Sequence, residues 1–199
     1  LSKQVFSNCS SFTKLKIPES ISLIEESAFY GCSLLEKIII PPSVTVIENY
    51  AFMGCYLLQQ IEIHSPVISF GYKAFNGIKS LEIIGNISEI PENMFKDCTI
   101  SQITFHSLIK KIGSSAFHNC STLKQLNIQL SITEIYDNTF FGCSSLEQFT
   151  IPASVISIGD FAFKECSSLK EIIIPPLVKS IGKHAFCGCS SIKQIAIPS

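Results

Sequence analysis

The chain has 199 residues, of which 46% are hydrophobic and 16% are charged, and its formal net charge at neutral pH is -1. This composition excludes a disordered chain, because it supplies enough apolar side chains to fill a continuous core. The small net charge argues against a partner such as nucleic acid or an anionic membrane, which requires a basic surface. The apolar runs are much shorter than the roughly 20 residues of a transmembrane helix, so we expect no transmembrane segment in this chain.

Phenylalanine recurs along the whole chain at nearly constant spacing. The column consists of Phe6, Phe29, Phe52, Phe75, Phe95, Phe117, Phe140, Phe163 and Phe186. Successive members are 23 residues apart, except for one step of 20 and one of 22. A repeat of this length cannot bury its apolar side alone, so the copies must stack on one another. The sequence therefore predicts a solenoid of about nine repeats that forms a single domain over residues 1–199.

The second copy shows the order of the elements within a repeat. Residues 25–29 are compatible with a short helical turn that ends at the column phenylalanine. Gly31 follows at a position that is Gly, Asn or Asp in every copy except at Glu165, and these residues favour a left-handed backbone turn. Residues 35–40 then alternate apolar and variable side chains, as a strand with one buried face does. Each copy should thus contribute one parallel strand.

Two copies are shorter than the others. An alignment on the apolar columns places the missing residues between Phe75 and Ile78 and between Cys98 and Ile100. In this alignment the first outward-facing position of successive strands runs through Gln60, Ser80 and Gln102. We therefore expect both deletions to fall in turns and the strands to keep their register.

Eight of the nine cysteines form a second column, three residues after the phenylalanines. They are Cys9, Cys32, Cys55, Cys98, Cys120, Cys143, Cys166 and Cys189. Ile78 stands near this column in the fourth copy, where an alkyl group could replace neither a metal ligand nor a disulfide partner. Side chains stacked about 4.8 Å apart also fit neither the converging Cβ atoms of a disulfide nor a tetrahedral zinc site. We expect reduced cysteines packed as small hydrophobic groups, and an exposed Cys187 outside the column.

The segment from Cys143 to Cys166 carries the combined pattern C-x-x-L-x-x-x-x-I-P-x-x-V-x-x-I-G-x-x-A-F-x-x-C. This pattern resembles the BspA-like class of leucine-rich repeats. The resemblance implies an α/β repeat fold, a leucine-rich-repeat solenoid with a parallel β-sheet on its concave face and short helical turns on its convex face. It also implies an adhesin-like protein at the cell surface or outside the cell, which binds matrix proteins or other cells.

An intracellular scaffold with the same fold is the alternative, because the odd number of apparently unpaired cysteines suits a reducing compartment. We find no Ser, His and Asp set with the spacing of a catalytic triad and no glycine-rich phosphate loop, so we expect neither an enzyme nor a cofactor.

The outward positions of the central strands depart from the rest. Proline ends the strand segment in the outer copies, as at Pro18, Pro41, Pro152, Pro175 and Pro198, but not in the four central ones. The polar side chains gathered there are Gln60, Glu62, His64, Glu82, Gln102, Thr104, His106, Gln125, Asn127 and Gln129. They form either a recognition patch for a protein ligand or a region that adjusted to the shortened fourth copy. We do not expect a metal site from Glu62, His64 and His106, because the two histidines lie two repeats, or roughly 10 Å, apart.

Neither end of the chain carries the polar cap that a repeat array needs. We therefore expect these residues to be part of a longer array and to associate end to end if isolated. Of the N-glycosylation sequons, only Asn86 lacks a core cysteine as its middle residue and remains a plausible acceptor.

Overall fold

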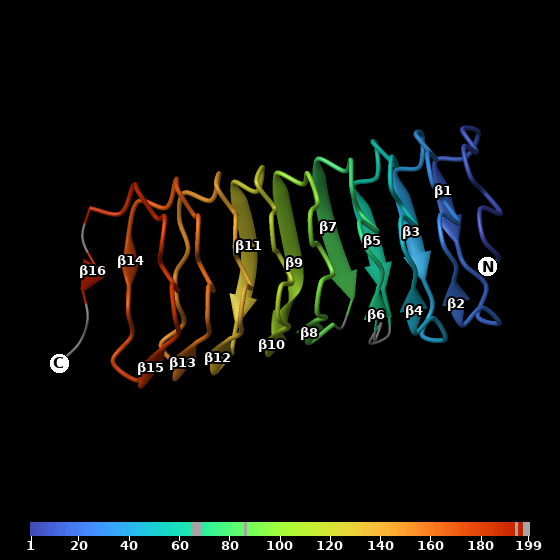
Figure 1. Ribbon diagram of the computed structural model, residues 1–199. Helices are drawn as coiled ribbons and strands as arrows, with labels where there is room; N and C mark the ends of the chain where they lie inside the picture. The colour runs from blue at the N-terminus through green and yellow to red at the C-terminus, as the bar shows by residue number, and fades with distance from the viewer. Residues whose placement is uncertain (65–68, 86, 194, 197–199) are drawn as a thin grey trace.

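The computed structural model describes residues 1–64, 69–85, 87–193 and 195–196, so that Gln194, Pro198 and the candidate glycosylation site Asn86 lie outside the described residues. The repeats stack side by side into one elongated solenoid, with β1 and β16 toward opposite ends (Figure 1). None of the described segments forms a helix that could span a membrane.

One side of the solenoid is a six-stranded parallel sheet. Its strands are β1 (Lys14–Lys16), β3 (Lys37–Ile40), β5 (Gln60–Ile63), β7 (Ser80–Gly85), β9 (Gln102–Ile109) and β11 (Gln125–Leu130), in that spatial order. Inward and outward residues alternate, so that Ile38 and Ile40 of β3 are fully buried while Lys37 and Ile39 of the same strand are half-buried. The alternation follows from the two-residue period of a strand and confirms the predicted parallel sheet.

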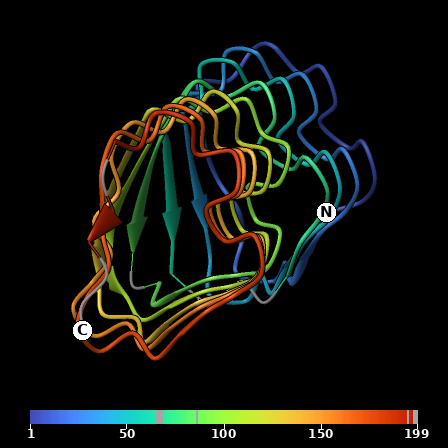
Figure 2. The same cartoon turned by 60° about the vertical axis from the view of Figure 1, so that its left-hand side comes forward.

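A row of two-residue strands runs along a second edge of the stack. It consists of β2 (Leu23–Ile24), β4 (Val46–Ile47) and β6 (Ser69–Phe70), then β8 (Glu89–Ile90) and β10 (Lys111–Ile112), then β12 (Glu134–Ile135), β13 (Ser157–Ile158) and β15 (Ser180–Ile181). Near the C-terminus β14 (Ile172–Ile173) pairs with β16 (Ile195–Ala196). Seen along the stack, the repeats follow one another as coils around a shared interior (Figure 2).

The interior is organised around the phenylalanine column. Neighbouring rings lie 5.2 to 5.7 Å apart between centroids, and most pairs are nearly parallel, as in the 3° angle between Phe29 and Phe52. The rings from Phe29 to Phe163 in this column are completely buried. Burial of an aromatic ring together with ring–ring contact makes each a large contributor to the core. The predicted column is confirmed as the continuous core of the stack.

The predicted helical turns are wrong, since the described residues contain no helix. In the second repeat the N–H of Ala28 donates to the Glu25 carbonyl, but the N–H of Phe29 donates to Ala51 of the next repeat. Gly31 likewise donates to Met53 of the next repeat. Every second N–H thus bonds between repeats, which a helix, whose bonds all lie within one segment, cannot provide.

Two left-handed residues in each repeat produce this alternation. The column two residues after each phenylalanine adopts positive φ as predicted, including Glu165 at 61° and Gly31 at 69°. A second column, two residues before each phenylalanine, has φ between 52° and 59° and consists of Gln4, Ser27, Tyr50, Lys73, Asn93, Ser115, Asn138, Phe161 and His184. Sequence analysis missed this column because glycine, the usual signal of positive φ, never occurs in it.

The shortened fourth repeat changes the strand register, contrary to the prediction that the deletions spare it. Gln60 of β5 lies beside Glu82 of β7, two residues beyond the predicted partner Ser80. Ser80 itself pairs with Gln102 as expected. A shift of two residues keeps the inward side chains inward, whereas a shift of one would expose them. An irregularity in β9 compensates for the shift. Asn127 and Gln129 of β11 are two residues apart, but their partners in β9, Thr104 and Leu108, are four residues apart.

Candidate ligand-binding face

The ten polar residues predicted to cluster do share one face of the solenoid. They occupy outward positions on β5, β7, β9 and β11, and His64 directly follows β5. We call this surface the central sheet patch, and it comprises Gln60, Glu62, His64, Glu82, Gln102, Thr104, His106, Gln125, Asn127 and Gln129. All ten side chains are exposed or half-buried, so the patch is accessible to a partner.

Glu62 contacts the side chains of Lys37 and His64 at one end of the patch. Its Oε1 lies 2.8 Å from His64 Nε2, and its Oε2 lies 3.2 Å from Lys37 Nζ. The hydrogen bond from Lys37 lowers the pKa of the Glu62 carboxyl, with a smaller contribution from His64. With a side chain that is only 23% exposed, Glu62 is the most fixed charge of the patch.

Glu82 is the second acidic centre, and the register shift determines its neighbours. Gln60 Nε2 donates to Glu82 Oε2 at 3.1 Å, and His106 Nε2 lies 3.8 Å from the same oxygen. In the predicted register Glu62 and Glu82 would be direct cross-strand partners, and like charges in that position repel each other. The observed register places Ile84 beside Glu62 instead. The shift therefore separates two carboxylates as well as accommodating the deletion.

The remaining patch residues form a looser surface on β9 and β11. Asn127 Nδ2 donates to Thr104 Oγ1 at 3.2 Å. The side chains of Gln102 and Gln125 form no hydrogen bond with any described residue. Amides that are exposed and unpaired can bond to a ligand without first breaking an internal contact.

Long strands explain why proline is missing from three of the four central repeats, although the four-residue β5 is also followed by a residue other than proline, His64. β7, β9 and β11 have six to eight residues, whereas β1, β3 and β5 have three or four. Proline has no N–H and cannot continue a ladder of hydrogen bonds. The loss of proline at β7, β9 and β11 thus has a structural reason, while neither its loss after β5 nor the identity of the polar side chains follows from strand length.

Chemically, the patch offers hydrogen-bonding groups and two anchored carboxylates. Over the residues that the structure describes, no three His, Cys, Asp or Glu side chains are grouped closely enough to hold a metal ion. His64 and His106 lie beside different carboxylates, at 2.8 Å from Glu62 and 3.8 Å from Glu82 respectively. The arrangement suits recognition of polar groups on another macromolecule.

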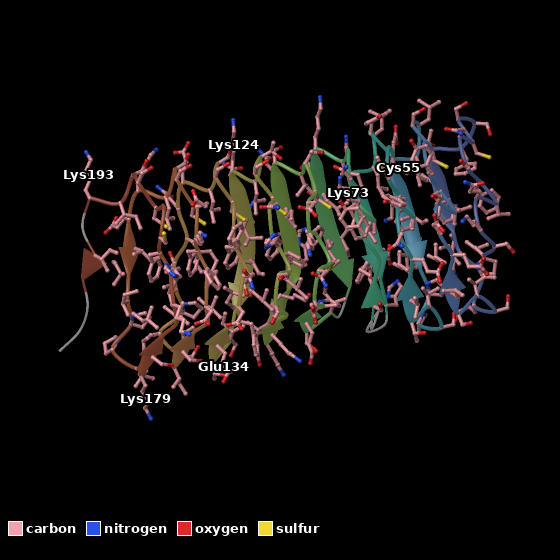
Figure 3. All side chains as sticks on the ribbon, in the orientation of Figure 1. Cys55, Lys73, Lys124, Glu134, Lys179 and Lys193 are labelled. Atoms are coloured by element: carbon pink, nitrogen blue, oxygen red, sulfur yellow. The ribbon has the colours of Figure 1, made fainter. Side chains whose placement is uncertain are left out.

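The cysteine column has the predicted structural role and one feature that the sequence did not reveal. All nine cysteines are free, Cys32 to Cys166 are buried, and Cys187 is exposed. The thiols of Cys55, Cys143 and Cys166 each donate to a phenylalanine carbonyl 26 residues earlier, at 3.1 Å. Burial raises the pKa of Cys98 to about 12, so that its thiol stays protonated at neutral pH. Figure 3 shows sulfur atoms, including that of Cys55, recurring along the stack.

Sequence analysis also missed a cleft of about 640 Å³ between β6 and β8, where the row of short strands is interrupted. Its apolar wall includes Phe70, Ile90 and Met94, and Glu89 and Lys111 lie at its rim. The shortened fourth repeat is the sequence feature nearest this cleft, since Phe75 and Phe95 are only 20 residues apart.

The chain matches a known repeat family over its whole length. The description of that family is a BspA type leucine rich repeat region with six copies, and the match covers residues 1–124 and 88–199. No curated protein matches the chain in sequence.

Several solved structures share the fold. One is a leucine rich cell surface protein from Faecalibacterium prausnitzii, 26% identical, with a TM-score of 0.54 over 96% of this chain and 61% of that protein. A leucine-rich repeat protein from Eubacterium ventriosum is 22% identical, with a TM-score of 0.56 over 94% of this chain and 54% of that protein. The pneumococcal vaccine antigen PcpA is 20% identical, with a TM-score of 0.58 over 94% of this chain and 51% of the antigen. The chain thus spans about half to three fifths of the length of these proteins.

Proposed function

Because the chain belongs to the BspA-type leucine-rich repeat family, we propose that it is an adhesin-like protein-binding module, displayed outside the cell, whose central sheet patch contacts the ligand. The observation that carries this proposal is the set of polar side chains held on one accessible face of β5, β7, β9 and β11. Extended sheets of solenoids provide such surfaces for macromolecular partners.

Preorganisation supports this surface over other exposed parts of the stack. Lys37 and His64 hold Glu62, and Gln60 holds Glu82, so both carboxylates are already oriented before a ligand arrives. Fixing side chains in advance lowers the entropy lost on binding. The expected partner is therefore a protein with basic and amide groups on its surface.

The proposed location rests on the solved structure from Faecalibacterium prausnitzii, which is a cell surface protein. An extracellular matrix protein or a protein on another cell is the class of ligand that this location suggests. An intracellular scaffold is the alternative function, supported by nine free cysteines, which suit a reducing compartment.

The test is a binding measurement against a panel of purified matrix proteins and cell-surface extracts immobilised on a sensor surface. Glu62→Lys and His106→Ala should each weaken binding, by about tenfold for the charge reversal, because a fixed carboxylate then repels the basic ligand surface. Glu134→Lys is the charge-matched control, since Glu134 is exposed on β12 away from the patch (Figure 3). Equal weakening by the control variant, or no weakening by either patch variant, would show that the ligand binds another surface.

A further inference from the structure

Neighbouring repeats are joined on the face that carries the two left-handed columns. We call it the turn face, the stretch from two residues before to two residues after each column phenylalanine. There the residue two positions before the phenylalanine, and the phenylalanine itself, donate an N–H to the next repeat. In the third repeat these bonds run from Tyr50 to Tyr72 at 3.0 Å and from Phe52 to Ala74 at 2.8 Å. The same two bonds recur at every junction between described repeats except one.

The exception is the junction between the fourth repeat, with β6, Phe75 and β7, and the fifth, with β8, Phe95 and β9. The N–H groups of Lys73 and Phe75 donate to no described residue. The carbonyls that they would reach, those of Glu92 and Met94, accept no bond from a described residue either. Phe75 is completely buried, and buried backbone groups are nearly always paired. The turn face is therefore open at this one junction.

The row of short strands is interrupted at the same junction, between β6 and β8 (Figure 1). In most repeats the residue that follows the short strand bonds back to the preceding repeat, as the Gly71 N–H does to the Ile47 carbonyl at 2.7 Å. Pro91 holds this position in the fifth repeat. A proline has no N–H, so it cannot donate to the carbonyl of Phe70.

The ring of Pro91 also needs space that a closed junction does not have. Four other repeats have glycine at this position, Gly71, Gly113, Gly159 and Gly182. A Cβ on these glycines would lie 2.2 to 2.6 Å from a backbone nitrogen of the preceding repeat, well inside the contact distance of packed atoms. Two repeats have glutamate instead, and there Glu25 and Glu48 each accept a backbone N–H of the preceding repeat at 2.9 Å. Pro91 offers neither solution and holds the two repeats apart on this side.

The core shows the same opening. The rings of Phe75 and Phe95 are tilted by 33° to each other, whereas all other neighbouring rings of the column are within 15° of parallel. Their centroids remain 5.5 Å apart, which agrees with a tilt between the repeats and not with a wide separation. Phe70 is 6% exposed, while its equivalent Ile47 is completely buried. The cleft of about 640 Å³, with Phe70 and Met94 in its wall, lies along this opening.

On the opposite side the same two repeats are fully joined. β7 and β9 form four residue pairs, the first between Ser80 and Gln102. At the end of the turn face nearest these strands, the Gly77 N–H donates to the Thr99 hydroxyl at 3.1 Å. The twist between neighbouring strands spans roughly 10 to 35° in proteins, so paired strands can change their angle and keep their ladder. A junction that is closed along the sheet and open along the turn face has the form of a hinge.

This junction lies beneath the central sheet patch. Gln60, Glu62, His64 and Glu82 belong to β5, its end and β7 on one side, and the other six patch residues belong to β9 and β11. Among the described residues one charged contact crosses between the two parts, from His106 Nε2 to Glu82 Oε2 at 3.8 Å. Both side chains are nearly half exposed, so this contact resists bending only weakly. A change of twist between β7 and β9 therefore changes the angle between the two parts of the patch.

We propose that the junction between the fourth and fifth repeats is a hinge. It opens and closes on the turn face about the paired strands β7 and β9, and so sets the angle between the two parts of the central sheet patch. Hinge motion between two intact bodies is a common way for a protein to fit a ligand. The hinge is a property of the free protein, and only its use, to fit the patch to a ligand, rests on the proposed function.

Amide hydrogen exchange, read by NMR on the free protein, tests whether the turn face is open. The amides of Lys73 and Phe75 should exchange at least about tenfold faster than those of Tyr50 and Phe52, which hold the same positions in the third repeat and are bonded. Equal protection of the two pairs would show that the junction is closed in solution and would overturn the proposal.

Substitution of Pro91 tests the cause. Pro91→Gly supplies an N–H for the Phe70 carbonyl and removes the ring, so exchange at Lys73 and Phe75 should slow at least about fivefold. Pro91→Ala supplies the N–H but keeps a Cβ, and it should slow exchange less. Pro152→Gly is the matched control, since Pro152 lies in the seventh repeat, and it should leave both amides unchanged. No slowing in Pro91→Gly, or the same slowing in the control, would contradict the hinge.

Residual dipolar couplings of the backbone amides measure the bending itself. In the unaltered protein β1 to β6 and β9 to β13 should give alignment tensors of different magnitude, because motion about a hinge averages the couplings of the two parts unequally. In Pro91→Gly the two magnitudes should converge. Equal magnitudes in the unaltered protein would show a rigid stack and overturn the proposal.

The binding measurement on the sensor surface tests the use of the hinge. For the ligand whose binding Glu62→Lys weakens, Pro91→Gly should accelerate dissociation at least about threefold, because the patch can no longer adjust its angle, and Pro152→Gly should not. If Pro91→Gly closes the hinge and leaves dissociation unchanged, the hinge does not serve the patch. If exchange and alignment show the hinge but no ligand of the panel binds, the proposed function fails and the hinge stands.

Discussion

The repeats that contribute the six strands of the large sheet and the last repeats are built from the same sequence pattern, yet only the former make a continuous sheet. Each of the strands β1, β3, β5, β7, β9 and β11 pairs with its neighbours in the large sheet, whereas the segment 148–151 pairs with neither β11 nor β14. The phenylalanine column is continuous through both parts, with a centroid separation of 5.3 Å between Phe117 and Phe140 and 5.2 Å between Phe140 and Phe163. The core and the sheet are thus separable, and the stack holds together through its core where the sheet opens.

The largest expected effect comes from removing a column ring in each part. Phe52→Ala should lower the free energy of unfolding by about 3 to 5 kcal/mol through lost burial and the cavity that remains. Phe140→Ala should cost less than Phe52→Ala, because the ring of Phe149, 4.7 Å away, can move into the space. Equilibrium denaturant unfolding measures both, and a larger loss for Phe140→Ala would contradict the view that the open part can adapt.

Proline substitution compares the continuous sheet directly with the unpaired segment 148–151. Thr104 lies inside the continuous sheet between Glu82 and Asn127, so Thr104→Pro should destabilise the protein by about 3 kcal/mol through loss of a ladder bond and a steric clash. Thr150→Pro should cost well under half as much, because the N–H of Thr150 bonds to no described residue. Thermal melting followed by circular dichroism distinguishes them, and equal losses would mean that the ladder is closed at Thr150.

The left-handed turn column provides a third comparison. Glu165 adopts a φ of 61°, so Glu165→Gly should stabilise the protein by up to about 1 kcal/mol by removing Cβ strain. Gly142 has a φ of 70° in the preceding repeat, and a Cβ there would lie 2.4 Å from Asn119 Oδ1. Gly142→Ala should therefore destabilise the protein. Chemical unfolding measures the change in the free energy of unfolding for both variants, and a change of the same sign would refute the assignment of a left-handed turn to this column.

The smallest expected effect concerns two carboxylates with lowered pKa values. Lys37 lowers the pKa of Glu62 in the intact sheet, and Lys170 lowers that of Glu147 beside the opening. Because ionisation is favoured in the folded state, each pair stabilises the fold above the ordinary glutamate pKa, and this contribution disappears as the pH falls through the lowered value. Lys37→Met and Lys170→Met should each raise the partner's pKa.

Added salt should separate these two pairs. Glu147 is 52% exposed and Glu62 is 23% exposed, so about 0.5 M salt should remove more of the shift at Glu147. Carboxyl titration by NMR measures both values in one experiment. A larger salt effect at Glu62 would show that its contact with Lys37 is not held by the sheet.

The sequence determined those features that depend on one residue type recurring in a column. Phenylalanine, cysteine and the Gly, Asn and Asp column carry their own physical preferences for burial, for compact packing and for positive φ, so each could be assigned without coordinates. The alternating strands and the outward polar patch also follow from local periodicity. Glu165, the exception in its column, adopts the left-handed conformation of its neighbours because the stack imposes it.

Only the tertiary structure decided the features that arise between repeats. The turns before each phenylalanine are not helical because their N–H groups bond to the adjacent repeat, which no local pattern reveals. The two-residue shift between β5 and β7 depends on which side chains oppose each other across strands, and the ring of Phe149 packs against both Phe140 and Phe163. A sequence specifies the faces of each repeat, but register and spacing come from packing repeats against one another, because both are properties of a pair and not of a segment.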